Sequence, residues 1–271
     1  RRVLFRSNLM ANGANVIVFA PLDAAGIVPV VEKANEAGVL VFSIDDSPAG
    51  GKVTATVRAD NVNAGAQGAE EMAKRLATAP CSKDDSCIVL ELQGALTTPN
   101  GLDRSKGFAE TLAKLAPKVQ IIQRPTEWTA DMAADAAQNV LTQNPNLAGI
   151  FMASELMATA VNAQLSAAGK GAAVGEDGAV IRIAIDGTPQ GLQLIRDKAL
   201  DATVSQPLSA YATKTAELIE LVHGGGKIEI GPRDDGQVID TPVGPQYQLK
   251  ATLVTAENVD SPDLWANQVG K

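Results

Sequence analysis

The sequence feature that most constrains the fold is an apolar strand-like run that ends at polar residues and is followed by a helical pattern. In the clearest copy, residues 180–185 form a β-branched run, Asp186 stands at its end, and Gly187 and Pro189 stop it. Three further runs end in the same way, at residues 16–19, 39–44 and 149–152. Repeated units of this kind predict parallel sheets that helices cover on both faces.

Composition sets the broad class of the chain. Its 271 residues are enough for two domains, and no low-complexity linker divides them. Aromatic residues make up only 3%, so the core must come from Ala, Val, Ile and Leu. The net charge of -8 argues against a nucleic-acid surface. No apolar run is long enough to cross a bilayer.

The two cysteines, Cys81 and Cys87, lie in a polar segment between a predicted helix and a predicted strand. Two cysteines in a short exposed loop favour a disulfide and hence an oxidising compartment. Two free thiols remain the alternative, because nothing in the sequence fixes the Cα separation that a bridge requires. The only histidine, His223, is distant in sequence, so we expect no metal site.

Polar residues at strand ends are the candidate functional groups. Ligands of an open parallel sheet bind beyond the carboxyl ends of its strands, where Asp186 stands. The alternative is that Asp186 only caps the following helix. Asp45 and Asp46 end another strand, but neighbours on an extended chain point to opposite faces, which weakens a glycosidase interpretation. With no nucleophile elbow, dinucleotide loop or metal cluster, the sequence predicts neither an enzyme nor a cofactor.

A binding protein needs hydrogen-bonding groups and a flat apolar surface. Arg104, at the expected start of a helix, offers fork-shaped donors, Asp45 and Asp186 accept, and Gln206 does both. Trp128 follows a strand, where its indole can lie against the C–H face of a sugar ring. The alternative for Trp128 is a lid on the local core.

Several motifs carry a resemblance to the ribose-type periplasmic sugar-binding proteins, the substrate-binding components of ABC transporters. They are Ala14–Pro21, Ile44–Asp45, Ala59–Asn61, Glu91–Gly94, Arg104–Phe108, Ile185–Pro189, Ala202–Gln206 and Leu253–Val259. The resemblance implies a type I periplasmic-binding fold: two doubly wound lobes, joined by several hinge crossings, that close on a monosaccharide or related polyol. It also implies a membrane permease as partner and a periplasmic or extracellular location, with lipid anchoring left open.

The same resemblance assigns ligand positions. Asp45, Arg104, Asp186 and Gln206 match those of the family, and Trp128 stands where the family has a stacking aromatic. Four positions depart from the pattern. Ser154 stands where an Asn is common, Ala20 where an Asn can occur, and Asp46 where ribose binders carry Arg, while Ile185 replaces an aromatic. These departures argue against ribose itself.

The resemblance also predicts the domain boundaries. We expect residues 8–59 and 207–242 in an N-terminal lobe, and residues 60–206 and 243–271 in a C-terminal lobe. Residues 1–7 resemble a translated sequencing adapter, so the family's first strand and helix are expected to be missing upstream. Such a chain would expose an apolar sheet edge along residues 16–19 and bind sugar poorly or not at all.

One alternative function shares the fold. The effector-binding core of a lactose-repressor-type regulator would carry a helix-turn-helix upstream and a dimer face. The cysteine pair and the C-terminal tail favour the exported carrier, which we expect to be a monomer without nucleic-acid partners.

Overall fold

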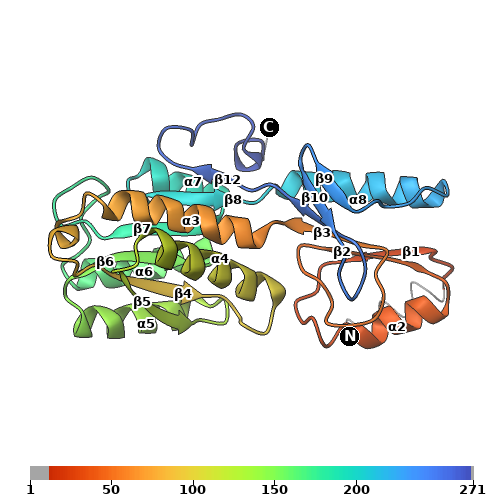
Figure 1. Cartoon of the computed structure of the whole chain (residues 1–271), viewed down its shortest axis with the longest axis horizontal. Coiled ribbons are helices and arrows are strands. Elements are labelled where there is room, and N and C mark those ends of the chain that lie inside the picture. The colour runs from red at the N-terminus through yellow and green to blue at the C-terminus, as the bar shows by residue number, and fades with distance from the viewer. Residues whose placement is uncertain (1–11, 270–271) are drawn as a thin grey trace. The chain divides into compact units, whose positions relative to one another are not determined.

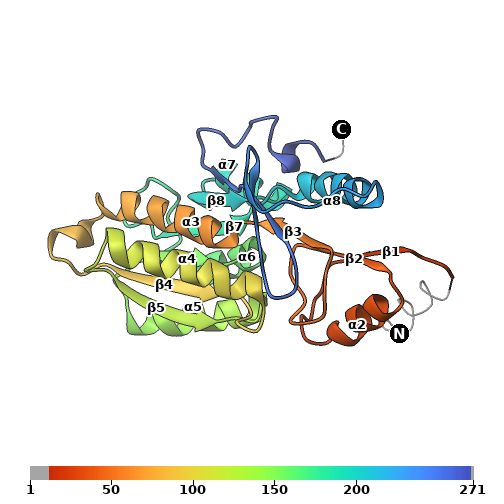
Figure 2. The same cartoon turned by 45° about the vertical axis from the view of Figure 1, so that its right-hand side comes forward.

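The computed structural model describes residues 12–269, which separate into two units (Figures 1 and 2). Within these residues, unit 1 comprises 12–60 and 207–250, and unit 2 comprises 61–206 and 251–269. The chain passes from one unit to the other three times, after Asp60, Gln206 and Lys250. The prediction for residues 1–7 falls outside the described part.

Unit 2 is built on one sheet in the order β12-β8-β7-β6-β4-β5. All neighbours are parallel except β12, which pairs antiparallel with β8. The strands are β4 (Ile88–Gln93), β5 (Gln120–Pro125), β6 (Leu147–Met152), β7 (Ile181–Asp186), β8 (Ala202–Ser205) and β12 (Thr252–Val254). The strand order reverses between β4 and β6, which is the kind of position where open α/β sheets bind ligands.

Helices cover both faces of this sheet, as the repeated unit predicts. Helices α3 (Asn61–Leu76) and α4 (Pro99–Leu115) lie side by side on one face (Figures 1 and 2). The other helices are α5 (Ala130–Gln143), α6 (Ala158–Ala167) and α7 (Pro189–Arg196), with short 3-10 turns η1 (Pro80–Lys83), η2 (Glu155–Met157) and η3 (Trp265–Asn267). Successive residues of β6 alternate between two apolar clusters: Ile150 and Met152 belong to one, and Phe151 belongs to the other.

Two glycines let α3 and α4 approach backbone to backbone. A Cβ on Gly107 of α4 would lie 1.9 Å from the carbonyl oxygen of Val62, and one on Gly65 of α3 would lie 2.2 Å from that of Arg104. The crossing of α3 and α4 therefore accommodates only glycine at these two positions. The contact fixes the helix that carries Arg104 against its neighbour.

Unit 1 contains a second sheet, in the order β1-β2-β3-β11-β10-β9, with parallel pairing from β1 to β11. Its strands are β1 (Val16–Phe19), β2 (Leu40–Ile44), β3 (Ala55–Ala59), β9 (Gly231–Arg233), β10 (Gly236–Ile239) and β11 (Gln246–Leu249), and its helices are α2 (Val28–Glu36) and α8 (Leu208–His223). The predicted class, two doubly wound parallel-sheet units joined by several crossings, is confirmed. Among the described strands β1 forms one edge, where the Val18 residue is 43% exposed.

Two predicted boundaries differ from the structure: the first lies after Asp60 and not after residue 59, and the last lies further along the chain than predicted. We expected residues 243–271 in the C-terminal lobe, but residues up to Lys250 belong to unit 1. The reason is that β11 pairs in parallel with β3, with Tyr247 opposite Val57. The extended run 247–254 is thus two strands in two different sheets, β11 in one and β12 in the other.

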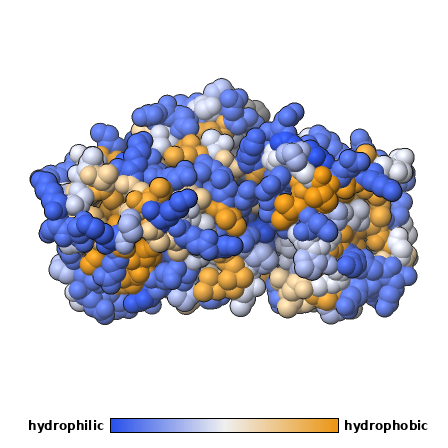
Figure 3. Space-filling view, in the orientation of Figure 1, coloured by the Kyte–Doolittle hydropathy of each residue, from blue (hydrophilic) through white to orange (hydrophobic). Residues whose placement is uncertain are grey.

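On the face seen in Figure 3, apolar side chains form several separate patches among hydrophilic ones. Within residues 12–269, every helix is too short or too polar to span a bilayer.

A disulfide joins Cys81 and Cys87, whose Cα atoms are 4.9 Å apart, next to the start of β4. Cys87 itself is buried against the apolar cluster under α3 and α4. The bridge therefore closes the connection between α3 and β4.

We expect reduction of this bridge to lower the free energy of unfolding by about 2 kcal/mol, because the closed loop is short and restricts the unfolded chain only modestly. Urea unfolding with and without a thiol reductant measures the difference. The variant with both Cys81→Ala and Cys87→Ala serves as the control, since the reductant should not change its midpoint. An unchanged wild-type midpoint in reductant would contradict the prediction.

Candidate functional site

Polar side chains gather at the carboxyl ends of the unit 2 strands. Ser154 follows β6, Asp186 ends β7 and Gln206 follows β8, while Arg104 lies on α4, the helix after β4. Hydrogen bonds join these four side chains into one cluster. The parallel pairing of β4, β6, β7 and β8 explains the convergence, because it brings those strand ends to one edge of the sheet.

Asp186 lies at the centre of the cluster. Its Oδ1 accepts hydrogen bonds from Arg104 Nη1 at 3.1 Å and Gln206 Nε2 at 2.7 Å, and its Oδ2 accepts one from Ser154 Oγ at 2.6 Å. The side chain keeps 17% of its surface exposed. Helix α7 is capped instead by Thr188, whose hydroxyl accepts from Gly191 N–H. The carboxylate of Asp186 thus serves the cluster and not the helix end.

Arg104 is almost fully buried, yet one end of its guanidinium keeps free donors. Nε donates to Asn61 Oδ1 at 2.7 Å, and Nη1 donates to the Ala153 carbonyl at 2.7 Å as well as to Asp186. Nη2 makes no hydrogen bond with any residue in the range 12–269. Since a guanidinium carries two N–H groups on Nη2, both are available to a ligand oxygen.

The predicted helix start at Arg104 is wrong. Helix α4 begins at Pro99, and Thr98 caps it by accepting from Gly101 N–H. The sequence contains this signal, a threonine followed by a proline at the first helical position. Arg104 therefore lies inside the helix, where Asn61 and its partner Asn100 hold the guanidinium from the side.

Trp128 lies beside this cluster in a loop with φ of 63°. Its ring centroid is 5.5 Å from Arg104 Cζ, within range of a cation–π interaction. The half-buried ring also packs against the apolar cluster on the α5 side of the sheet. A Cβ on Gly94 would fall 2.1 Å from the indole, so Gly94 makes room for it. Both interpretations of Trp128 describe part of its environment: it covers the core and it flanks the polar cluster.

The most perturbed acid of the region is Glu155, which we did not predict as a site residue. Its carboxylate accepts from the N–H groups of Gly187 and Thr188 at 2.9 and 2.8 Å, and from the hydroxyls of Thr188 and Thr203. Burial raises the pKa of Glu155 to about 7, with a smaller contribution from Asp186, although the threonine donors act the other way. The available signal was its position at a strand end, next to Ser154, which the resemblance had selected. Asn61 and Asn100, which support Arg104, carried no such signal.

We expect the buried Glu155 to make the fold less stable as pH rises. A carboxyl group with a folded-state pKa above its unfolded value stabilises fully below pH 4.5, and loses this contribution as pH rises through about 7. The loss for Glu155 amounts to up to about 3 kcal/mol. Urea unfolding from pH 4.5 to 8 of the wild type and of Glu155→Gln isolates it, because the other buried acids contribute to both proteins. Parallel curves for the two proteins would contradict the prediction.

The other two predicted ligand residues belong to unit 1. Asp45 follows β2 with φ of 69°, and its N–H donates to the Val57 carbonyl at 2.9 Å. Asp46 is buried, and its Oδ1 accepts from Ser47 N–H at 3.0 Å. The structure thus brings five of the seven predicted residues together in unit 2 and places these two next to each other in unit 1.

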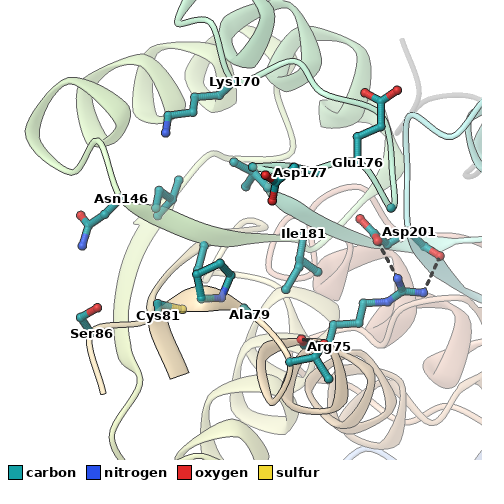
Figure 4. A pocket seen from close by; sticks show the side chains of 18 of the residues that line it. Arg75, Ala79, Cys81, Ser86, Asn146, Lys170, Glu176, Asp177, Ile181 and Asp201 are labelled. Carbon is teal, nitrogen blue, oxygen red and sulfur yellow. Dashed lines mark hydrogen bonds and ion pairs between the residues drawn. The ribbon is translucent and has the colours of Figure 1, made fainter. Parts of the chain in front are cut away.

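A hollow of about 860 Å³ lies at the opposite edge of the unit 2 sheet, where Cys81 of the disulfide lines it, and none of the predicted ligand residues is among its lining residues (Figure 4). Arg75 faces it, but its guanidinium is already bound by Glu71 and Asp201 at 2.7 Å each. The positive charge is therefore neutralised within the protein. Among residues 12–269 no group of acids, histidines or cysteines could hold a metal ion.

Comparison with known proteins gives the family. The model of the periplasmic binding protein domain matches residues 5–227. The chain belongs to this family. Its members are solute-binding proteins and not enzymes, and nothing in the comparisons supports the repressor alternative.

Two curated relatives match most of the chain. The D-allose-binding periplasmic protein of Escherichia coli is 28% identical over 249 residues, which are 89% of this chain and 73% of that protein. The ribose import binding protein of Salmonella typhimurium is 26% identical over 223 residues, which are 82% of this chain and 70% of that protein.

Solved structures of the family have the same fold. A galactofuranose binding protein superposes with a TM-score of 0.78 at 23% identity, covering 98% of this chain and 83% of that one. An ABC transporter periplasmic solute binding protein from Actinobacillus succinogenes with bound D-allose superposes with a TM-score of 0.77, also at 23% identity, covering 95% of this chain and 84% of that one.

Proposed function

We propose that this chain is the substrate-binding protein of an ABC importer and binds a monosaccharide or a related polyol for delivery to a membrane permease. The observation that carries the proposal is the pairing of the free Arg104 Nη2 donors with the partly exposed Asp186 carboxylate. Adjacent sugar hydroxyls each donate and accept, so a donor next to an acceptor matches two neighbouring hydroxyls.

The neighbouring groups support the same ligand class. The indole of Trp128 offers an apolar face beside the polar pair. A sugar ring presents the matching surfaces, because its C–H face is apolar and its hydroxyls are polar. Gln206 and Ser154 hold the Asp186 carboxylate in place by donating to both its oxygens. Asp45 and Asp46 complete the proposed ligand set.

The proposed location is the periplasm or the outer face of the cell membrane. The disulfide between Cys81 and Cys87 supports it, because such bridges persist in oxidising compartments. We propose that the protein acts as a monomer.

A fluorescence titration tests the proposal. In the Trp265→Phe variant, Trp128 is the only indole, because the chain has two tryptophans. The panel is D-allose, D-ribose, D-fucose, L-arabinose and myo-inositol. We expect at least one of them to change the Trp128 emission saturably and to shift the amide resonances around Asp186, since NMR detects weak as well as tight binding. The Trp128→Phe variant, which keeps Trp265, should show no change in emission. If neither method responds to any panel member, the proposed function is wrong.

A further inference from the structure

Glu155 is buried and connects three segments of the candidate site. It follows β6, is only 6% exposed, and binds the turn after β7 through Gly187 and Thr188. It also binds Thr203 of β8. One carboxylate thus accepts from two backbone N–H groups and two hydroxyls.

The surrounding backbone is shaped to admit this carboxylate. A Cβ on Gly191, in the first turn of α7, would lie 2.0 to 2.2 Å from the carboxyl atoms of Glu155. Any side chain at Gly191 would therefore displace the carboxylate. Thr188 supports the same turn twice, because it caps α7 as well as donating to Glu155.

The turn that Glu155 holds has an uncommon backbone conformation. Asp186 has a φ of 139° and Gly187 a φ of 70°. A Cβ on Gly187 would also lie 2.2 Å from Ser205 Oγ. A non-glycine residue in this region persists only where its surroundings hold it. The two N–H groups that follow Asp186 are those that Glu155 accepts, so Glu155 supplies part of this restraint.

We propose that Glu155 is a positioning residue whose ionised carboxylate fixes the turn at residues 186–188 and thereby the sugar-binding carboxylate of Asp186. The affinity for sugar then depends on the protonation state of Glu155. This inference rests on the proposed function for its link to sugar, and on the geometry of the turn alone for the role of Glu155.

The chemistry of the carboxyl group explains why the affinity for sugar depends on the protonation state of Glu155. An ionised carboxylate only accepts, which suits four donors. A protonated one must donate its O–H, so a threonine hydroxyl has to turn round and the restraint on the turn weakens. The pKa of about 7 places this change near neutral pH.

The direction of the pH dependence of sugar affinity follows from the charges that face Glu155. Asp186 is the charged group acting on it and is itself paired with Arg104; the other facing groups are the hydroxyls of Thr188 and Thr203 and the backbone of Gly187 and Gly191. A sugar hydroxyl that donates to Asp186 reduces the repulsion between the two carboxylates. Binding therefore favours ionised Glu155, releases protons near pH 7 and becomes tighter as pH rises.

The first test needs no ligand. In the wild type, we expect the Gly187 and Thr188 amide resonances to titrate with the same midpoint as the Glu155 side-chain carboxyl carbon. In Thr203→Val, which removes a donor to the ionised form, this midpoint should move to higher pH. In Glu155→Gln it should disappear. Amide resonances that do not titrate, or a midpoint that is the same in Thr203→Val, would overturn the positioning role.

The second test measures affinity for D-allose, or for whichever panel member binds best, from pH 5.5 to 8.5 by calorimetry in two buffers. We expect the wild-type dissociation constant to fall as pH rises, and binding to release protons. At pH 8 the dissociation constant of Glu155→Gln should be about tenfold higher than that of the wild type, and it should not depend on pH. Glu71→Gln, which removes another buried carboxylate of unit 2, controls for a general loss of stability and should keep the wild-type profile. A pH-dependent Glu155→Gln would overturn the link to affinity. A wild type that binds none of the panel refutes the proposed function, whereas the first test still decides whether Glu155 holds the turn.

Discussion

Replacing Arg104 by alanine is expected to raise the dissociation constant for sugar at least about 100-fold. The substitution removes the free Nη2 donors and one of the donors to the Asp186 carboxylate. Both effects act in a site where Arg104 itself is 3% exposed, so water replaces the lost contacts poorly. Calorimetry or NMR titration with the best panel sugar measures the change.

Two variants control for the loss of charge and of folding. Arg196→Ala removes an arginine of the same unit that pairs with Asp260 on the surface, and should leave the affinity unchanged. Arg104→Lys keeps the charge but not the fork that reaches Asn61, Ala153 and Asp186, so we expect it to recover little binding. An Arg104→Ala protein that is folded by circular dichroism and binds as well as wild type would remove Arg104 from the site.

Replacing Gly107 by alanine is expected to lower the free energy of unfolding by about 3 kcal/mol, at the top of the typical range for overpacked sites. Alanine favours a helix over glycine by about 1 kcal/mol, so local propensity alone predicts the opposite sign. The cost comes from the new Cβ, which would lie 1.9 Å from the Val62 carbonyl oxygen and must push α3 and α4 apart. Urea unfolding followed by circular dichroism measures the change.

Gly224→Ala is the matched control. Gly224 has a φ of -77°, and a Cβ there would meet its nearest atom at 3.4 Å, an ordinary contact. We expect its unfolding midpoint to stay close to that of wild type. If Gly107→Ala were equally stable, the close approach of the two helices would not contribute to stability as described.

The regular part of the fold was predictable from the sequence because its signals are local. The run 180–185 and the stop at Gly187 and Pro189 match β7 and the start of α7 closely. The final strands were not predictable from the sequence, because nothing in the run 247–254 reveals that its two halves pair in different sheets. That division depends on β3 and β8, which are distant in sequence.

The residues of the candidate site also fall into those that the sequence reveals and those that it does not. Asp186 was found because strand ends are recognisable, and its alternative role as a cap failed because Thr188 already fills that position. Glu155 was missed because its importance lies in the donors that surround it, Thr203 and the turn after β7. Such partners come from other strands and become visible only once the chain is folded.

The positions where the chain crosses between units have a consequence for how binding could be sensed. Asn61, which holds the Arg104 guanidinium, is the first residue of unit 2 after one crossing, and Gln206, which holds the Asp186 carboxylate, is the last before another. A guest bound by Arg104 or Asp186 is therefore one side-chain hydrogen bond away from a residue that adjoins a crossing.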